Sequence, residues 1–171
     1  ETLSEDFAIT VFYYNPNISF SEEYRKRVAE QKRLIAAYNK EEKGWPIDIV
    51  EGDYEPERFY EMAKGYENCP EGGERCFRCF DLRLRKTAEL AFAGGFDYFA
   101  TTLTISPLKN AAKINEIGEE LAEIYHVQHL PSDFKKKNGY KRSIELSHEY
   151  DLYRQNYCGC VYSRREAENR K

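Results

Sequence analysis

The sequence predicts an α/β fold in which helices flank a parallel sheet. Two observations support this prediction: short runs rich in β-branched and aromatic residues recur along the chain, and segments with helical periodicity alternate with them. Neither an internal repeat nor a linker divides the sequence, so we expect one domain over residues 1–171. In folds of this class, active groups lie beyond the carboxyl ends of the strands.

The first predicted strand is the run FAITVFYYN at residues 7–15, which is apolar and has high β-propensity. The turn-forming residues 15–17 end it. Ser19 and Glu22 have the spacing of a capping box, and apolar residues then recur near the helical period. We therefore expect an amphipathic helix from Ser19 to the break at residues 44–46.

The next elements continue the alternation. A short apolar strand is expected at residues 47–52, followed by a helix over residues 55–65 with Pro56 in its first turn. A strongly helix-favouring run then begins near Arg83 and ends at the paired glycines 94–95. The sequence thus predicts a second strand and two further helices in its first half.

The second half repeats the pattern less regularly. Residues 96–106 predict another buried strand, residues 110–125 a helix, and residues 127–130 a short strand stopped by Pro131. From Ser143 onward, helical signals alternate with a cysteine-bearing glycine turn. Polar side chains at the expected strand ends are those of Asn15 to Asn17, Asp53, Ser106 to Lys109 and Asp133.

Composition excludes several classes of protein. The chain is 41% apolar and 15% aromatic, which is too much for a disordered protein. No apolar run approaches the roughly 20 residues that span a bilayer, so we expect no membrane insertion. The formal charge of -4 gives no global attraction to nucleic acid. Five cysteines without a secretory signal favour thiolate chemistry in a reducing cytoplasm.

Four of the five cysteines form two close pairs, Cys76-x-x-Cys79 and Cys158-Gly-Cys160. Two thiolates at such spacing can reach one metal ion or cluster without a long loop. Soft thiolate ligands suit zinc or an iron–sulfur cluster, and the composition does not choose between them. Because the two pairs lie far apart in the sequence, a shared site has to be assembled by the tertiary fold.

Basic residues are interpreted by their surroundings. The run KKKNGYKR at residues 135–142 concentrates five positive charges around a tyrosine, which favours nucleic-acid binding. The stretch at residues 25–33 alternates with Glu on a predicted helix, and we interpret it as a solvent-facing surface. Cys69, which stands apart from the pairs, is expected to be a buried free thiol.

Four segments together resemble the cobalamin-independent epoxyqueuosine reductases of the QueH family. They are YNPNI from Tyr14, EGGERCFRCFDLRL from Glu71, TTLTISPLKN from Thr101 and KKNGYKRSIELSHEYDLYRQNYCGCVYS from Lys136. The resemblance implies a cytosolic iron–sulfur enzyme with a PP-loop or HUP-like, Rossmann-type three-layer fold. Its expected activity is reduction of the epoxide of epoxyqueuosine in tRNA to queuosine, the final step of that tRNA modification.

The resemblance also sets expectations for the metal centre. Members of the family look to begin with a further strand and a CCxPC-like loop, and this sequence starts beyond that point, so the metal site is expected to be incomplete. Epoxide reduction needs two electrons that no side chain supplies. We therefore expect a 4Fe-4S cluster, with one additional iron or other divalent metal as a further option, and an electron donor that the sequence does not identify. The expected metal ligands are Cys76, Cys79, Cys158 and Cys160, and Asp81 is a candidate oxygen ligand or proton donor.

Recognition of the modified tRNA is assigned to polar and aromatic residues at the strand ends. A flipped nucleotide needs hydrogen-bond partners and a stacking surface. The candidates for binding the nucleoside are Tyr14, Asn15, Asn17, Ser106 and Lys109. The candidates for contacting tRNA phosphates are Lys136, Lys137, Arg142 and Arg154.

Two alternative functions stay open at this point. Thiolates holding zinc would make the chain a tRNA-binding domain without catalysis, and such a protein is colourless, whereas an iron–sulfur protein is brown. In the other alternative, Cys76 and Cys79 form the dithiol of an oxidoreductase, with Cys79 near the start of a helix whose dipole lowers a thiol pKa.

Overall fold

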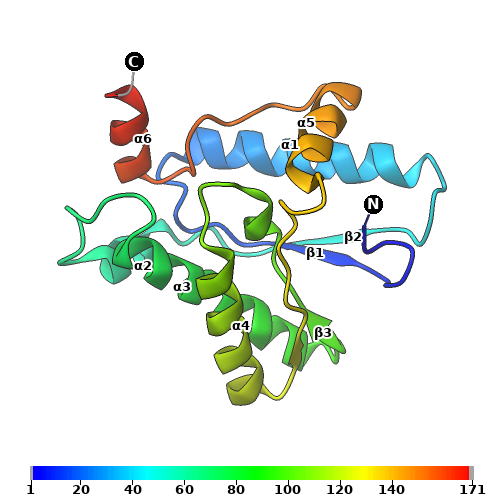
Figure 1. The fold of residues 1–171 in the computed structure, drawn as a ribbon, viewed down its shortest axis with the longest axis horizontal. Helices are drawn as coiled ribbons and strands as arrows, with labels where there is room; N and C mark the ends of the chain where they lie inside the picture. Colours follow the sequence, from blue (N-terminus) through cyan, green and yellow to red (C-terminus); the bar gives the residue numbers. More distant parts are fainter. Residues whose placement is uncertain (1, 170–171) are drawn as a thin grey trace.

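A computed structural model describes residues 2–169, and strands and helices alternate along most of it (Figure 1). This confirms the predicted mixed α/β class. The elements are β1 (Thr10–Tyr13), α1 (Ser21–Asn39), β2 (Asp48–Glu51), α2 (Pro56–Ala63), α3 (Glu74–Ala93), β3 (Tyr98–Phe99), the 3-10 helix η1 (Thr102–Ile105), α4 (Ala111–Tyr125), β4 (Gln128–His129), α5 (Gly139–Glu149) and α6 (Val161–Glu168).

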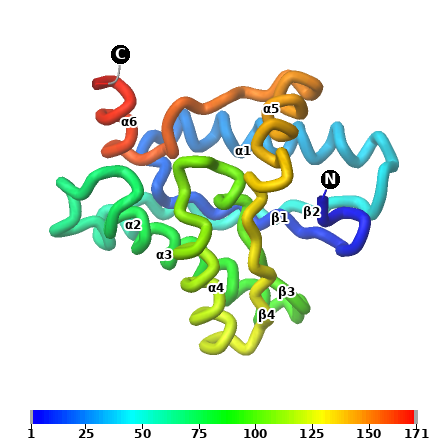
Figure 2. Tube along the Cα trace, in the orientation of Figure 1, coloured from blue at the N-terminus to red at the C-terminus, as the bar shows by residue number. Residues whose placement is uncertain are grey.

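The strands form two parallel pairs and not one continuous sheet within residues 2–169. β1 pairs with β2, with Tyr13 opposite Glu51, and β3 pairs with β4, with Tyr98 opposite Gln128. Figure 2 shows the two pairs in different parts of the molecule. The predicted strand at residues 96–106 is mostly absent because the chain enters η1, where the Thr101 side chain accepts a hydrogen bond from Leu103 N. Parallel pairing is thus confirmed, but a three-layer sheet is not.

The start of α1 differs from the prediction. Its N-cap is Phe20, and no side chain caps it, so the expected capping box between Ser19 and Glu22 is wrong. Ser19 is occupied elsewhere: its Oγ accepts from Val161 N at 2.9 Å, and its own N donates to Gly159 O at 3.1 Å. The residue therefore joins the start of α1 to the cysteine-bearing turn near the C-terminus.

Helix α3 begins at Glu74, well before the predicted start near Arg83. The pattern near Cys76 already follows a helical stripe, because the buried residues of α3 include Cys76, Phe80, Leu84 and Ala88, each four residues apart. This stripe packs against Ile114, Ile117 and Leu121 of α4 to form the largest apolar cluster. The extra turns place both cysteines of the first pair on a rigid helix.

Another part of the core lies between α1 and the first strand. Tyr13, Ile18, Tyr24 and Val28 form a second apolar cluster between β1 and α1.

In residues 2–169, the helices are all too short or too polar to cross a bilayer.

Candidate metal centre

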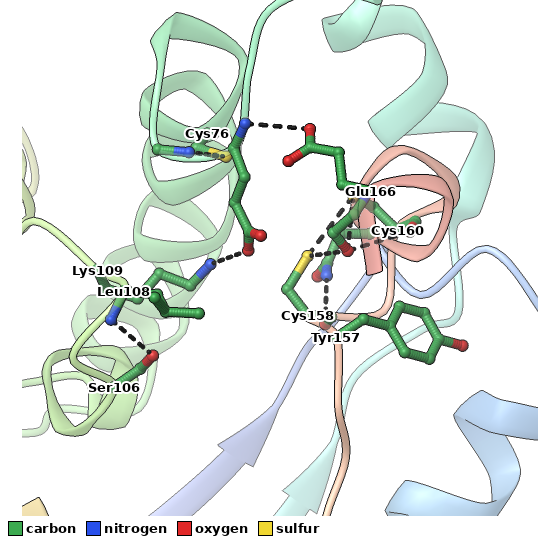
Figure 3. Close-up of polar contacts among 12 residues, drawn as sticks. Cys76, Ser106, Leu108, Lys109, Tyr157, Cys158, Cys160 and Glu166 are labelled. Atoms are coloured by element: carbon green, nitrogen blue, oxygen red, sulfur yellow. Dashed lines mark hydrogen bonds and ion pairs between the residues drawn. The ribbon is translucent and has the colours of Figure 1, made fainter. Parts of the chain in front are cut away.

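The fold brings the two cysteine pairs together. Cys79 of α3 lies in one apolar cluster with Cys160 and Phe59, and Cys158 packs against the edge of that cluster. Cys76 lies one turn earlier on the same helix, and its electrostatic interaction with Cys158 places it near the second pair. Figure 3 shows Cys76 on α3 facing the turn that carries Cys158 and Cys160. The expectation that the tertiary fold joins the pairs is therefore supported.

The second pair is already arranged as two neighbouring ligands. The Sγ atoms of Cys158 and Cys160 lie 3.5 Å apart and share a hydrogen bond. Two thiolates bound tetrahedrally at about 2.3 Å from one ion lie about 3.8 Å apart, so this spacing fits a common metal. Gly159 makes the turn possible, since its φ of +118° lies in a region that L side chains rarely adopt.

The four thiols differ in how readily they lose a proton. Burial raises the pKa of Cys79 to about 12 and also raises the pKa of Cys76 above its usual value. The hydrogen bond between the two thiols lowers the pKa of Cys158 and raises that of Cys160. Of this pair, Cys158 therefore loses its proton more readily. Metal binding at all four sulfurs would release protons from the other thiols.

A buried ion pair lies beside the thiols. Lys109 Nζ is 3.4 Å from Glu71 Oε1, and the two side chains are only 10% and 14% exposed. The backbone N of Glu71 donates to Glu166 Oε1 at 3.1 Å, which links the ion pair to α6 (Figure 3). The positive charge of Lys109 also contributes to the lowered pKa of Cys158, after the hydrogen bond between Cys158 and Cys160. Lys109 therefore brings a desolvated cation to the thiol cluster.

The fit of this region to a metal is partial. Sulfur donors, a preformed pair and nearby cations suit a thiolate-bound metal. Within residues 2–169, however, no three His, Cys, Asp or Glu side chains are arranged to hold one ion. Asn17, which is 2% exposed, donates from Nδ2 to Cys158 O at 3.2 Å, while its Oδ1 is buried without a partner in the described chain. That oxygen is an acceptor available to a bound group.

The nucleoside-binding candidates are distributed unevenly around the thiols. Asn17 and Lys109 belong to the cluster, and Asn15 adjoins it because its Oδ1 accepts from Arg83, the residue one turn beyond Cys79 on α3. Tyr14 is 4% exposed, its ring stacks on Phe12, and its hydroxyl donates to Glu55 at 3.0 Å. The Oγ of Ser106 accepts from the backbone N of Leu108 at 3.3 Å.

Asp81 is not among the residues that the fold gathers at the thiols. A helix turns about 100° per residue, so a side chain two residues beyond Cys79 points to another face of α3. There Asp81 is 40% exposed and pairs with Arg85 at 2.9 Å.

The candidates for phosphate contact lie around α5 and the turn before it. Lys136 pairs with Asp133 at 3.4 Å, and Arg142 lies 3.5 Å from Glu149. Arg154 donates to Ser147 Oγ at 3.0 Å. Lys137 has a φ of +50° in the turn before α5. Neighbouring carboxylates therefore offset part of the positive charge of this surface.

Sequence reasoning missed the burial and the contacts of two arginines that shape the site. Arg27, interpreted as part of a solvent-facing surface, is 9% exposed and donates to the backbone at Cys158. Arg75 is 2% exposed and donates to the carbonyls of Tyr66 and Glu67 ahead of α3. In the sequence, both arginines lie among other charged residues, so nothing there distinguishes them from solvent-exposed arginines. Cys69 is a free thiol, as expected, but it is only partly buried.

Together, the fold and the site define a mixed α/β protein with a candidate thiolate metal centre. The family model described as epoxyqueuosine reductase QueH matches residues 1–166. Relatives of that name include a Streptococcus pyogenes protein, 47% identical over 163 residues, with 95% of this chain and 64% of the relative covered. The Staphylococcus epidermidis protein is 44% identical over 165 residues, with 95% of this chain and 69% of the relative covered. The Thermotoga maritima protein is 38% identical over 155 residues, with 89% of this chain and 77% of the relative covered.

The chain therefore belongs to the QueH family, which confirms the resemblance seen in its motifs. It spans 64% of the length of the Streptococcus pyogenes relative.

Proposed function

We propose that this chain acts in the reduction of epoxyqueuosine in tRNA to queuosine, with a 4Fe-4S cluster held by its paired cysteines. The observation that carries the proposal is the convergence of Cys79, Cys158 and Cys160 in one apolar cluster, with Cys76 one turn away. The name shared by its relatives, epoxyqueuosine reductase, supports the substrate. A tRNA substrate in turn supports a cytoplasmic location.

The reaction balances as a deoxygenation. An epoxide gains two electrons and two protons, loses both C–O bonds and yields an alkene and water. When bound, an iron–sulfur cluster would supply the electrons, which an as yet unidentified donor must replace. The proposal also includes one additional iron or other divalent ion, with the four cysteines divided between that ion and the cluster.

The residues of the chain have separate roles in this proposal. Cys76, Cys79, Cys158 and Cys160 hold the metal. Lys109 stabilises the negative charge that develops on the departing oxygen, because a cation in a desolvated site acts strongly on nearby charge. Asn17, whose Oδ1 is buried without a donor in the described chain, accepts a hydrogen bond from the nucleoside.

The proposed fold goes beyond the two strand pairs. Each pair is joined through a helix in parallel, as in the β1–α1–β2 unit, and such units are the building blocks of Rossmann-type three-layer folds, including the PP-loop or HUP-like type. We therefore assign the domain to that class.

The dithiol alternative is weakened by the charge states of the thiols. A redox dithiol needs a lowered pKa on its attacking cysteine, whereas burial raises the pKa of both Cys76 and Cys79. The zinc alternative is separated from the proposal by experiment.

The test is anaerobic reconstitution with iron and sulfide, followed by metal analysis and an assay on tRNA that carries epoxyqueuosine, with dithionite supplied as the chemical reductant. We expect a brown protein that forms queuosine. Cys158→Ser should lose iron and activity, while Cys69→Ser, a cysteine outside the cluster, serves as the matched control. Unchanged iron content and epoxide reduction in Cys158→Ser would refute the ligand assignment, and a colourless protein that binds only zinc would support the alternative.

A further inference from the structure

Residues 150–160, here called the strap, run along α1 and carry the second cysteine pair (Figure 1). Arg33 donates to the carbonyls of Tyr150 and Asp151 at 2.9 and 2.8 Å. Glu30 accepts from Tyr153 N at 2.7 Å. These contacts fix the first half of the strap through its backbone.

Four α1 residues that hydrogen-bond to the strap share one face of the helix. Glu23, Arg27, Glu30 and Arg33 recur at spacings of three or four residues, which places them in one row. Glu23 accepts from the Tyr153 hydroxyl at 3.1 Å as well as from Arg27. The stretch at residues 25–33, interpreted from sequence as a solvent-facing surface, therefore contributes to the docking face of the strap.

Arg27 differs from the others because it is buried and reaches the cysteines. Its NH1 donates to Cys158 O at 3.1 Å and its NH2 to Tyr157 O at 3.3 Å. Its Nε donates to Glu23 Oε1 at 2.7 Å, and the guanidinium lies 5.2 Å from the centre of the Tyr157 ring. One planar fork thus joins α1 to two successive carbonyls.

Three successive carbonyls around the cysteine turn are held in this way. Tyr157 O accepts from Arg27, Cys158 O accepts from Arg27 and Asn17, and Gly159 O accepts from Ser19 N at 3.1 Å. A carbonyl oxygen has two lone pairs, so the acceptor capacity of Cys158 O is filled. The peptide planes on both sides of Cys158 are fixed, and with them the direction of its side chain.

We propose that Arg27 is a positioning residue that orients the Cys158–Cys160 pair for metal binding through the backbone carbonyls of residues 157 and 158. The proposal deepens the proposed function, because it assumes that these thiols are ligands. Lysine would not replace Arg27, since an ammonium lacks the planar fork that reaches two carbonyls and Glu23 at once.

The test compares Arg27→Gln and Arg27→Lys with Arg33→Gln, the matched control. Arg33 lies in the same row and also donates to two carbonyls, but far from the cysteines in the strap. The first readout is Co²⁺ titration of the reduced, metal-free full chain, followed by the sulfur-to-cobalt charge-transfer absorption. Partners that orient metal ligands typically contribute about 10-fold to 100-fold in affinity, and we expect a loss of that size in both Arg27 variants.

The second readout needs no metal. Iodoacetamide alkylation of the metal-free chain, quantified by mass spectrometry, should be faster at Cys158 and Cys160 in the Arg27 variants and unchanged in Arg33→Gln. Thermal unfolding identifies any variant that has lost its fold, and Arg27→Lys serves as the second variant if Arg27→Gln has. Equal effects at both positions, or rescue by lysine, would overturn the proposal.

The two readouts keep the proposals distinguishable. A wild-type chain that binds neither iron nor Co²⁺ would contradict the proposed metal centre. The alkylation rates would still decide whether Arg27 orients the thiols.

Discussion

Replacing Gly159 with alanine tests how tightly the cysteine turn is packed. At this residue φ is +118°, and an added Cβ would lie 2.7 Å from Ile18 Cγ1 and 3.2 Å from Arg27 NH1. Ile18 is 1% exposed and cannot move aside into solvent. The substitution therefore strains the backbone and forces the side chains that hold the turn apart.

The expected loss of stability has two parts. A non-glycine residue in such a backbone conformation costs about 1–3 kcal/mol, and overpacking a filled site costs about another 1–3 kcal/mol. The sum is about 2–6 kcal/mol, which lowers the Tm of a chain of this length by roughly 2–4 °C for each kcal/mol. Gly65 supplies the matched control, because its φ is +81° and no atom lies within 4 Å of the added Cβ. Gly65→Ala should show only the backbone part.

The assay is urea unfolding of both variants and the wild type, together with Co²⁺ titration of the second cysteine pair. Gly159→Ala should lose about 1–3 kcal/mol more than Gly65→Ala, since both variants share the backbone strain and only one is overpacked. It should also bind Co²⁺ more weakly, whereas Gly65→Ala should not. Equal losses of unfolding free energy, with unchanged Co²⁺ affinity, would refute the reasoning about close packing.

Three further predictions concern buried charges. Burial lowers the pKa of His129 below its ordinary value of 6.5, so as the pH falls the unfolded chain takes up a proton before the folded one does. The free energy of unfolding, measured with urea, should therefore drop from pH 7.5 to pH 5.5. The drop should be smaller in His129→Gln. Arg75→Met leaves the carbonyls ahead of α3 without their donor and should lower the free energy of unfolding by about 2–5 kcal/mol in the same assay. A loss no larger than that of Arg78→Met, at an exposed arginine, would contradict this. Lys109→Met removes a cation that lowers the pKa of Cys158, so the pH profile of Cys158 alkylation should move to higher pH. An unchanged profile would show that Lys109 has no electrostatic effect on Cys158.

The parts of the fold that sequence predicted are those governed by local patterns. Helix α4 begins beside Asn110, whose side chain accepts from Lys113 N, and α2 begins with Pro56, both as expected. Such signals act within one turn of helix, so a single sequence displays them. The cysteine pairs were also visible, since spacing alone marks them.

The errors arose where distant residues compete for a local group. Ser19 has the spacing of a helix cap, but Val161 N takes its hydroxyl as acceptor. Arg27 occurs in an alternating charged stretch, and only the path of the strap shows that it is buried. The strand expected after Phe96 ends early because Thr101 caps a 3-10 turn. Each outcome depends on a partner whose distance in sequence hides it.

The strap is held to α1 mainly by hydrogen bonds to its main-chain carbonyl oxygens, and this determines which of its residues can change in evolution. Arg33 and Arg27 both donate to carbonyls, and every residue type offers a carbonyl. Exposed positions such as Gln155 and Asn156 can thus change without weakening the hydrogen bonds that hold the strap. The exposed side chains of this segment can therefore diverge in sequence while the cysteine sulfur atoms beneath them keep their positions.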